Sequence, residues 1–512
     1  MSLFSLEKIP CRDELSGMQR LFCSEEIEKS THTLAEREEV SNKIIGSIEE
    51  AVRLCGLQDG MTISFHHHFR GGDYIVNMVM DVLAQMGFKN LVLAASSLTD
   101  CHTPLIVHIR NGVIRRIETS GLRGELADAI SHGLMDVPVV FRSHGGRAGA
   151  IDIGELPIDV AFLGAPSCDP YGNANGYIRD TDEGIMCGSM GYAKCDAQYA
   201  KKTVIITNHV VHYPNAPFAI PESEVDYIVK VDEIGDSAGI MSGATRFTKN
   251  PKELLMAQTA CKVIVASGRF EDGFSFQTGT GGASLAVTRF LRDAMIAKGI
   301  QASFALGGIT GSIVALHEEG LVKKLLDVQS FDLQAAESLR DNRFHQQISA
   351  SYYASPYNEG TAVNQLDAVV LSALEVDCEF NVNVLTGSDG IIRGAIGGHQ
   401  DTAFGASVSI VVVPLTRGRI PCVVKRVGAV VTPGKTVDVI VTDYGIAVNP
   451  SRPHLRQRII DCGLPVFTID VLQQKAEQLV GIPDPIEYED RVVGVVTYRD
   501  GTVIDVIRQV KD

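Results

Sequence analysis

The chain has 512 residues, and at roughly 100–200 residues per domain this length predicts at least two domains and excludes a single small binding module. Apolar residues make up 45% and charged residues 21%, so the chain has enough apolar material for folded cores. With 62 acidic and 46 basic residues the net charge is −16, which argues against nucleic acid and anionic membrane surfaces as partners. A small anionic ligand would need a local basic cluster.

The eleven cysteines include no C-x-x-C pair, which argues against a disulfide framework or a zinc ribbon and favours a reducing compartment. The segment 1–8 has no basic region leading into a long apolar run, and no stretch of about eighteen apolar residues occurs without charge. We therefore expect a cytoplasmic protein with no membrane span.

Apolar side chains recur at helical spacing over 34–55, and Gly56 follows as a stop signal, so this segment predicts a long amphipathic helix. The next segments predict a β-loop-α-β unit: a strand at 61–65, a tight turn at Gly71–Gly72, a helix at 74–86 and a strand at 91–95. The same order returns later in the chain, with a strand at 263–266, glycines at 279–282, a helix at 285–295 and a strand at 302–306. The two glycine pairs are 210 positions apart.

A second pair of similar segments is related by a constant offset. The buried-strand patterns 158–163 and 366–371 both carry an acid at their second position. The residues that follow them match 208 positions apart, with Ala165, Asp169, Asn173 and Asn175 corresponding to Ala373, Asp377, Asn381 and Asn383. Two echoes at nearly equal offsets indicate an ancient duplication with one α/β domain in each half.

The predicted fold is therefore α/β, with two tandem domains at 1–240, including the leading helical segment, and 241–512. We expect mainly parallel sheets, with added hairpins at Asn111–Gly112 and Asp500–Gly501, where the turn residues favour tight hairpins. No Pro-rich or low-complexity linker separates the halves, so they should pack closely, with a site between them.

The glycine-rich stretch 275–284 opens a predicted helix, where free N–H groups and the helix dipole suit a phosphate or an oxyanion. A plain tight turn is the alternative. A dinucleotide site is not favoured, because Ser284 occupies the position of the third glycine in that motif.

Two basic clusters are candidates for an anion pocket. In the first, His66, His67 and His68 precede Arg70, Gly71 and Gly72; neighbouring side chains of an extended segment point to opposite faces, so these histidines do not predict a metal site. In the second, Arg142, His144 and Arg147 surround a glycine turn, and the two guanidiniums could clasp carboxylates. Ordinary strand-end polarity and a solvated basic loop are the respective alternatives.

The loop 394–405 combines glycines with polar side chains after a strand, which is typical of active-site loops and also of mobile surface loops. Glu375 directly follows a buried strand and is either a functional buried carboxylate or an ion-pair partner.

The segments 64–73, 159–173 and 397–401 resemble those of the CoA-transferase superfamily and, within it, the family of citrate lyase alpha chains; the resemblance covers nearly the whole chain. It implies two tandem NagB/RpiA/CoA-transferase-like domains. It also implies transfer of citrate onto an acyl carrier thiol in exchange for acetate, with acetyl-CoA as a possible substitute for the carrier and no tightly bound cofactor. The implied partners are the beta (lyase) subunit and the gamma (acyl carrier) subunit, within an oligomer.

The transfer reaction builds an oxyanion in each step, and the amides of Gly281, Gly282, Gly397 and Gly398 are the candidate donors. Glu375 completes the catalytic candidates. The substrate-binding candidates are the residues of the two basic clusters together with Gly307, Gly308, His399 and Gln400.

Related transferases carry a nucleophilic Glu in a segment similar to 306–311, at a position we equate with Gly311. This departure predicts direct transfer in a ternary complex, without an enzyme-CoA thioester. The alternatives are a CoA-transferase or thioesterase for another carboxylate such as citramalate, a non-catalytic scaffold of the complex, and a sugar-phosphate sensor on the same fold.

Overall fold

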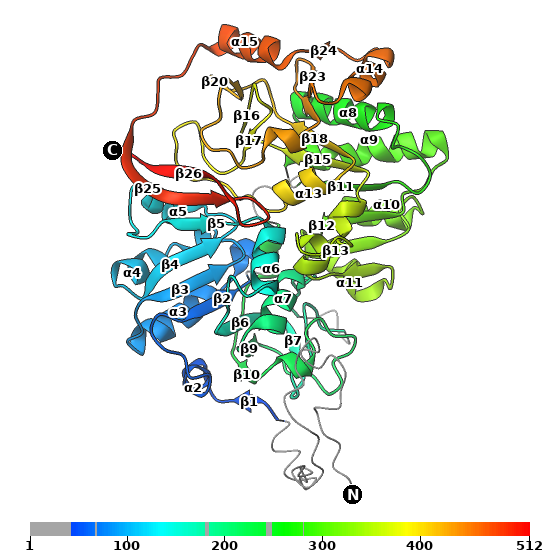
Figure 1. The fold of residues 1–512 in the computed structure, drawn as a ribbon. Coiled ribbons are helices and arrows are strands. Elements are labelled where there is room, and N and C mark those ends of the chain that lie inside the picture. Colours follow the sequence, from blue (N-terminus) through cyan, green and yellow to red (C-terminus); the bar gives the residue numbers. More distant parts are fainter. Residues whose placement is uncertain (1–41, 67–68, 180–183, 242–247, 280, 512) are drawn as a thin grey trace, which may run out of the picture. The chain divides into compact units, whose positions relative to one another are not determined.

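The computed structural model describes residues 42–511 apart from 67–68, 180–183, 242–247 and 280 (Figure 1). Two large sheets organise the chain. The first contains, in spatial order, β1 (Ile44–Ile45), β10 (Tyr227–Lys230), β9 (Lys202–Thr207), β6 (Val160–Ala165), β2 (Thr62–Phe65), β3 (Leu91–Ala95), β4 (Ile114–Thr119), β5 (Val139–Phe141), β25 (Tyr488–Thr497) and β26 (Val503–Val510). The second contains β14 (His345–Gln347), β13 (Leu325–Ser330), β12 (Phe304–Ile309), β11 (Ser275–Thr278), β15 (Ala368–Ser372), β18 (Val408–Val412), β22 (Val439–Val441), β23 (Ile446–Val448) and β24 (Val466–Phe467).

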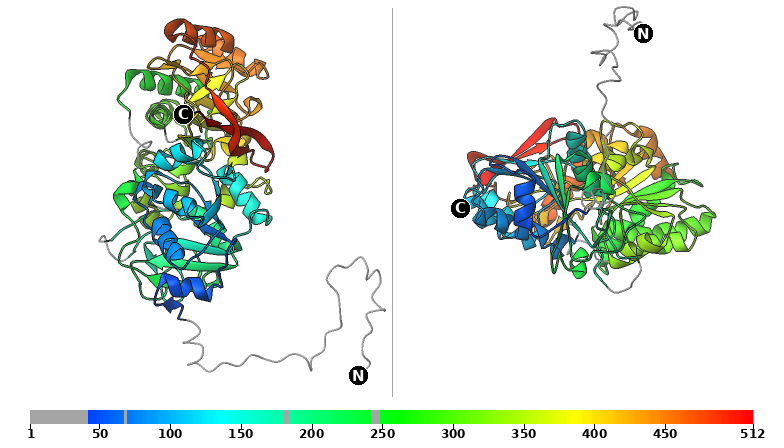
Figure 2. Two further views of the ribbon diagram at one scale, coloured as in Figure 1. Left: turned by 90° about the vertical axis from the view of Figure 1, so that its left-hand side faces the viewer. Right: turned by 90° about the horizontal axis from the view of Figure 1, so that it is seen from below.

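Helices connect these strands (Figures 1 and 2). Those of the first half are α2 (Ile48–Leu54), α3 (Ile75–Gln85), α4 (Leu105–Arg110), α5 (Gly124–Ser131), α6 (His144–Asp152) and α7 (Gly191–Tyr199). Those of the second half are α8 (Pro251–Ala266), α9 (Gly282–Lys298), α10 (Gly311–Glu318), α11 (Leu333–Asp341), α12 (Ala350–Ala354), α13 (His399–Gly405), α14 (Pro453–Asp461) and α15 (Ile469–Val480). No described helix combines the length and the apolar character needed to cross a membrane.

Short strands complete the fold. They pair as β7 (Ser167–Cys168) with β8 (Ala174–Asn175), as β16 (Glu375–Asp377) with β17 (Val382–Asn383) and β21 (Val423–Val424), and as β19 (Thr416–Arg417) with β20 (Ile420–Pro421).

The strand order repeats in the two halves, as a duplication predicts. Seven parallel strands of the first sheet, β10-β9-β6-β2-β3-β4-β5, repeat in the second as β22-β18-β15-β11-β12-β13-β14. Each of these seven strands therefore has a counterpart at the same place in the other half. Such strands are buried on both faces by the connecting helices, and all six residues of β6 are buried.

The two acids at corresponding positions of the repeat accept equivalent hydrogen bonds in the two halves. Asp159 Oδ2 accepts the backbone N–H of Thr62 at 2.8 Å, and Asp367 Oδ2 accepts that of Ser275 at 3.0 Å. Each carboxylate thus satisfies the first donor of the neighbouring central strand, which the parallel ladder leaves unpaired.

A second matched pair holds the turns after β7 and β16. Asp169 Oδ1 accepts the N–H of Asn173 at 3.1 Å, and Asp377 Oδ1 accepts that of Asn381 at 2.9 Å. In each turn the asparagine side chain also donates to the same carboxylate. These contacts explain why the Asp and Asn residues recur at one offset.

Three element predictions are wrong. Residues 263–266 are the end of helix α8, which begins after the Asn250 cap with Pro251 in its first turn and buries residues at helical spacing. The predicted helix 34–55 falls partly outside the described residues, and its described part is helical only from Ile48, where Ser47 caps α2. At Asn111–Gly112 the chain passes from α4 into β4, which pairs in parallel with β3, so no hairpin forms there.

The hairpin predicted at Asp500–Gly501 is confirmed, since β25 and β26 pair antiparallel across this turn. β25 also pairs in parallel with β5, so the hairpin extends the first sheet (red beside cyan in Figure 1). The division into 1–240 and 241–512 stays a prediction, to which the structure adds that residues 488–510 belong to the sheet of the first half.

Candidate functional site

A cavity of about 430 Å³ lies where loops at the carboxyl ends of parallel strands from both halves meet. This is where α/β sheets usually bind ligands. From the first half it is lined by Arg70, Ser97, Thr99, Ser120, Arg123, His144 and Tyr192. From the second half it is lined by Gln277, Thr278, Gly279, Gly281, Gly308, Val328, Gln329, Phe331, Tyr353, residues 371–374, Val384, residues 393–399 and Arg417.

The charged residues in the described lining of this cavity are all basic. Four arginines contribute to its lining, namely Arg70, Arg123, Arg393 and Arg417, whereas none of its described lining residues is an Asp or a Glu. A protein of net charge −16 thus concentrates positive charge at one place. The arrangement suits a ligand with several negative charges.

Arg70 reaches the cavity from η4 (Arg70–Gly72), the short 3-10 turn between β2 and α3. Its φ of 53° places a non-glycine residue in the left-handed region, which costs roughly 1–2 kcal/mol and requires support from the surroundings. Close packing supplies part of that support, because a Cβ on the neighbouring Gly72 would lie 2.2 Å from Asp236 O.

Glycine loops line the opposite wall. Gly281 caps α9, and Gly397, with φ of 56°, precedes α13. His144 N–H donates to Gly397 O at 2.8 Å and so ties this loop to the first half. The N–H groups of Gly281, Gly397 and Gly398 donate to none of the described residues, which leaves them available to a bound oxyanion.

Neutral polar groups complete the lining. Thr278 Oγ1 and Gln329 Nε2 are buried and without a partner among the described residues. Tyr353 Oη, by contrast, accepts Gln277 Nε2 at 3.0 Å. Unpartnered buried polar atoms are rare in folded proteins, and at a cavity they indicate where a ligand or water makes hydrogen bonds.

Two cavity histidines are uncharged. Burial, reinforced by the nearby charge of Arg147, lowers the pKa of His144 to about 3, and burial lowers the pKa of His399 to about 4. The ring of His144 packs on that of Tyr192, with centroids 4.4 Å apart, and His399 Nδ1 lies 2.7 Å from Thr432 Oγ1. At neutral pH these imidazoles offer hydrogen bonds rather than charge.

These depressed pKa values make the protein sensitive to acid. Below pH 6.5 the unfolded chain protonates both histidines, whereas the folded protein does not, so stability present above pH 6.5 is lost as the pH falls toward 4. We expect His399→Asn to reduce this loss by up to about 2 kcal/mol at pH 4.5. Urea unfolding at pH 7.5, 6.0 and 4.5 measures this loss of stability in the wild type and the variant. His454→Asn, at an exposed site, is the control. If the free energy of unfolding falls equally with pH in His399→Asn and in the wild type, the prediction is wrong.

The second basic cluster does not reach the cavity with its arginines. Arg142 donates from Nε to Glu118 at 2.8 Å and from Nη2 to Glu155 at 3.0 Å. Arg147 makes a bidentate ion pair with Asp196, at 2.6 and 2.8 Å. Both guanidiniums are committed to carboxylates of the protein, and of this cluster only His144 lines the cavity.

Only part of the first basic cluster lines the cavity. Arg70 lines the cavity, whereas His66 does not and has its Nδ1 2.5 Å from Ser96 Oγ; His67 and His68 lie outside the described residues. Gly71 and Gly72 do not line it either. Gly72 instead permits close contact between η4 and η7 (Ser237–Ile240).

Among the other candidates, Gly281, Gly308, Gly397, Gly398 and His399 line the cavity, and Gly282, Gly307, Gln400 and Glu375 do not. Gln400 is fully buried and donates to Val431 O and Thr497 O, so it links α13 to the C-terminal hairpin. A Cβ on Gly307 would collide with Gln277, and one on Gly282 with Glu253.

The hydrogen bonds of Glu375 are made within the protein and indicate a structural role. Its Oε1 accepts Asn383 Nδ2 at 2.9 Å and Gly428 N–H at 2.6 Å, and burial raises its pKa. Gly311 opens α10, and a Cβ there would meet Gln334 Oε1 at 1.9 Å rather than the cavity. Gly311 is therefore not the position of a cavity nucleophile, but the described lining still contains no carboxylate.

Sequence reasoning missed Arg123, Arg393, Arg417, Gln277 and Tyr353. Arg123 follows the end of β4 and precedes α5, so it lies at the same edge of the sheet as the loops that were singled out. Recognising 114–119 as a parallel strand would have pointed to it.

The comparisons with known proteins agree with this geometry. A family model described as the citrate lyase alpha subunit matches residues 41–510. The citrate lyase alpha chain of Escherichia coli K12 is 60% identical over 470 residues, which are 92% of this chain and 91% of that protein; the one of Klebsiella pneumoniae is 59% identical over 94% of each chain.

Solved structures extend the likeness. An alpha subunit of citrate lyase from Streptococcus mutans, solved in complex with citrate, has a TM-score of 0.89 and 57% identity over 92% of both chains. The malonate decarboxylase alpha subunit of Acinetobacter baumannii has a TM-score of 0.64 at 15% identity, which shows a shared fold alone. The chain belongs to the citrate lyase alpha subunit family, within the CoA-transferase-like proteins.

Proposed function

We propose that the chain is the citrate CoA-transferase subunit of a citrate lyase, converting citrate and an acetylated carrier thiol into the citryl thioester and acetate. The observation that carries the proposal is the cavity, whose described lining has four arginines and no carboxylate. Family membership supports the same reaction, and the relative from Streptococcus mutans was solved with citrate bound.

The reaction needs two acyl transfers. A citrate carboxylate oxygen attacks the acetyl carbonyl, and the carrier thiolate leaves, which gives a mixed acetyl-citryl anhydride. The thiolate then attacks the citryl carbonyl, and acetate leaves with the bridging oxygen. Holding citrate and thioester together in one cavity makes both attacks effectively intramolecular.

Each attack places negative charge on a carbonyl oxygen. In this proposal the free N–H groups of Gly281, Gly397 and Gly398 stabilise that charge, and the helix dipole of α9 adds to the field at Gly281. The described lining offers no carboxylate nucleophile, which favours direct transfer over a thioester on the enzyme.

The carrier enters at the exposed side of the cavity, where Arg393 and Arg417 lie. Their guanidiniums suit the phosphates of a CoA-like arm. Beta and gamma subunits of a citrate lyase complex are the proposed partners, and free acetyl-CoA is the proposed substitute for the acetylated carrier.

The test is acetate release by the purified chain from acetyl-CoA with citrate or with citramalate. We expect release with citrate, faster than with citramalate, and no loss of activity when borohydride is added together with acetyl-CoA, because no enzyme thioester forms. Absence of acetate with citrate would overturn the proposed function, and inactivation by borohydride only when acetyl-CoA is present would overturn direct transfer.

A further inference from the structure

The four cavity arginines fall into two classes. Arg70 is buried and Arg123 is half-buried, whereas Arg393 and Arg417 are exposed. Arg393 is already paired with Asp389, and Arg417 donates to the carbonyl oxygens of residues 373 and 374. An exposed guanidinium interacts weakly because water screens its charge, so the buried class should dominate the binding of a small anion.

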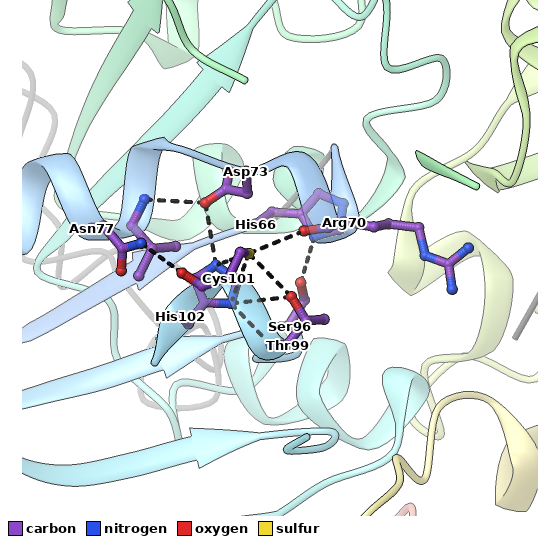
Figure 3. Close-up of polar contacts among 9 residues, drawn as sticks. His66, Arg70, Asp73, Asn77, Ser96, Thr99, Cys101 and His102 are labelled. Carbon is purple, nitrogen blue, oxygen red and sulfur yellow. Dashed lines mark hydrogen bonds and ion pairs between the residues drawn. The ribbon is translucent and has the colours of Figure 1, made fainter. Parts of the chain in front are cut away.

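A network of polar contacts surrounds the turn that presents Arg70 (Figure 3). Asp73 Oδ2 accepts the N–H of Val76 at 3.2 Å and lies 3.3 Å from His102 Nε2, and Cys101 Sγ lies 3.6 Å from Arg70 O. These contacts hold the left-handed backbone, and the guanidinium points away from them. There Nη1 donates to Ile240 O at 3.0 Å, and the group stacks 4.8 Å from the Phe331 ring centroid.

Arg123 occupies the N-cap position of α5 in an extended conformation, in the loop after β4, which lies two strands from β2 in the same sheet. Its side chain makes no hydrogen bond or ion pair with the described residues, although the charge of Asp100 acts on it. Burial, reinforced by the charge of Arg123, lowers the pKa of Arg70 to about 10. Two positive groups thus face one cavity closely enough to repel each other, and an anion between them would relieve that repulsion.

We propose that Arg70 and Arg123 form a two-arginine clamp that binds the two carboxylates of citrate that do not react. The clamp rests on the proposed function, because the third carboxylate must reach the thioester. Ser97, Thr99 and Ser120 line the same wall and offer hydroxyls to the remaining carboxylate oxygens and to the citrate hydroxyl. Arg123 is thereby a specificity-determining residue that stands outside the basic clusters of the sequence.

The clamp makes a prediction about substrate choice. Citrate keeps two free carboxylates during the reaction, and citramalate, in which a methyl group replaces one carboxymethyl group, keeps only one. Two guanidiniums therefore match citrate, and with citramalate one of them stays unpaired in a partly buried site, which is costly. Removing Arg123 should take away the advantage of citrate more than it weakens citramalate.

The experiment compares the full chain with Arg123→Met, Arg123→Lys and, as the matched control, Arg417→Met. Calorimetric titration gives Kd for citrate and for citramalate, and acetate release gives KM for acetyl-CoA. We expect Arg123→Met to raise Kd for citrate about ten- to hundredfold and Kd for citramalate by clearly less, with KM for acetyl-CoA unchanged. Arg123→Lys should recover part of the citrate affinity, because it keeps the charge without the bidentate geometry.

The control behaves in the opposite way, since Arg417→Met should raise KM for acetyl-CoA and leave Kd for citrate unchanged. An unchanged ratio of the two Kd values in Arg123→Met, with thermal unfolding like that of the wild type, overturns the clamp. If Arg123→Met is unfolded, Arg123→Lys decides, because a merely structural role would weaken both acids equally. Wild-type protein that binds citrate without releasing acetate would overturn the proposed function and leave the clamp supported by the Kd ratio.

Discussion

Replacing Arg147 with Ala is expected to lower the free energy of unfolding by about 3–5 kcal/mol and to leave Kd for citrate of the folded protein unchanged. Arg147 is 3% exposed, and its guanidinium pairs with the fully buried Asp196 through two hydrogen bonds and also donates to Ala94 O at 3.1 Å. The variant leaves the Asp196 carboxylate charged and without its partner in the interior. Urea unfolding and citrate titration measure the two effects.

A double variant and a surface pair supply the controls. Arg147→Met combined with Asp196→Leu removes both charges and should recover much of the lost stability, because an apolar pair of similar volume replaces the ion pair. Arg53→Ala breaks an exposed pair with Glu49 and should cost less than about 1 kcal/mol. A loss of citrate affinity in folded Arg147→Ala would instead indicate that Arg147 binds the substrate.

Gly398→Ala is expected to lower kcat for acetate release on the order of a hundredfold, which is typical when one oxyanion donor is lost. Gly398 has φ of −91°, so alanine is compatible with its backbone and the effect is steric. The added Cβ would lie 2.3 Å from Tyr353 Oη, and the buried Tyr353 ring cannot move away. The loop carrying the free N–H groups must then shift.

The same geometry provides a rescue. Tyr353→Phe removes the oxygen that the new methyl group meets, so Gly398→Ala with Tyr353→Phe should be more active than Gly398→Ala alone. Gly360→Ala, where the nearest atom to a Cβ is Asn358 Oδ1 at 3.3 Å, controls for the substitution itself and should keep full activity. If Gly398→Ala has wild-type kcat, this loop does not supply the oxyanion donor.

The repeat could be predicted from the sequence because its signals are local. Asp159 and Asp367 cap the central strand of their own half, and each is next to the strand pattern that identifies it. The segment 263–266 misled the prediction for the same reason. Its β-branched residues favour a strand, but the helical spacing of the residues before them and the cap at Asn250 decide for α8.

The site was less accessible, because pairing in space decides which charged groups are free. Nothing near Arg147 in the sequence indicates that Asp196, 49 positions later, neutralises it. Arg123 stands in no motif and is available because its side chain makes no ion pair or hydrogen bond with the described residues. A basic cluster in the sequence shows where positive charge is, and only the fold shows which of it remains uncompensated.

The pairing of β5 with β25 also sets an order of events during synthesis. Val140 and Val495 are neighbours in the sheet but about 350 positions apart in the chain. At roughly 5–20 residues per second, the ribosome needs about 20–70 s to deliver the second strand after the first. Throughout that interval β5 is an open strand edge, the kind of surface on which chains aggregate, so the nascent chain should depend on protection until the hairpin closes the sheet.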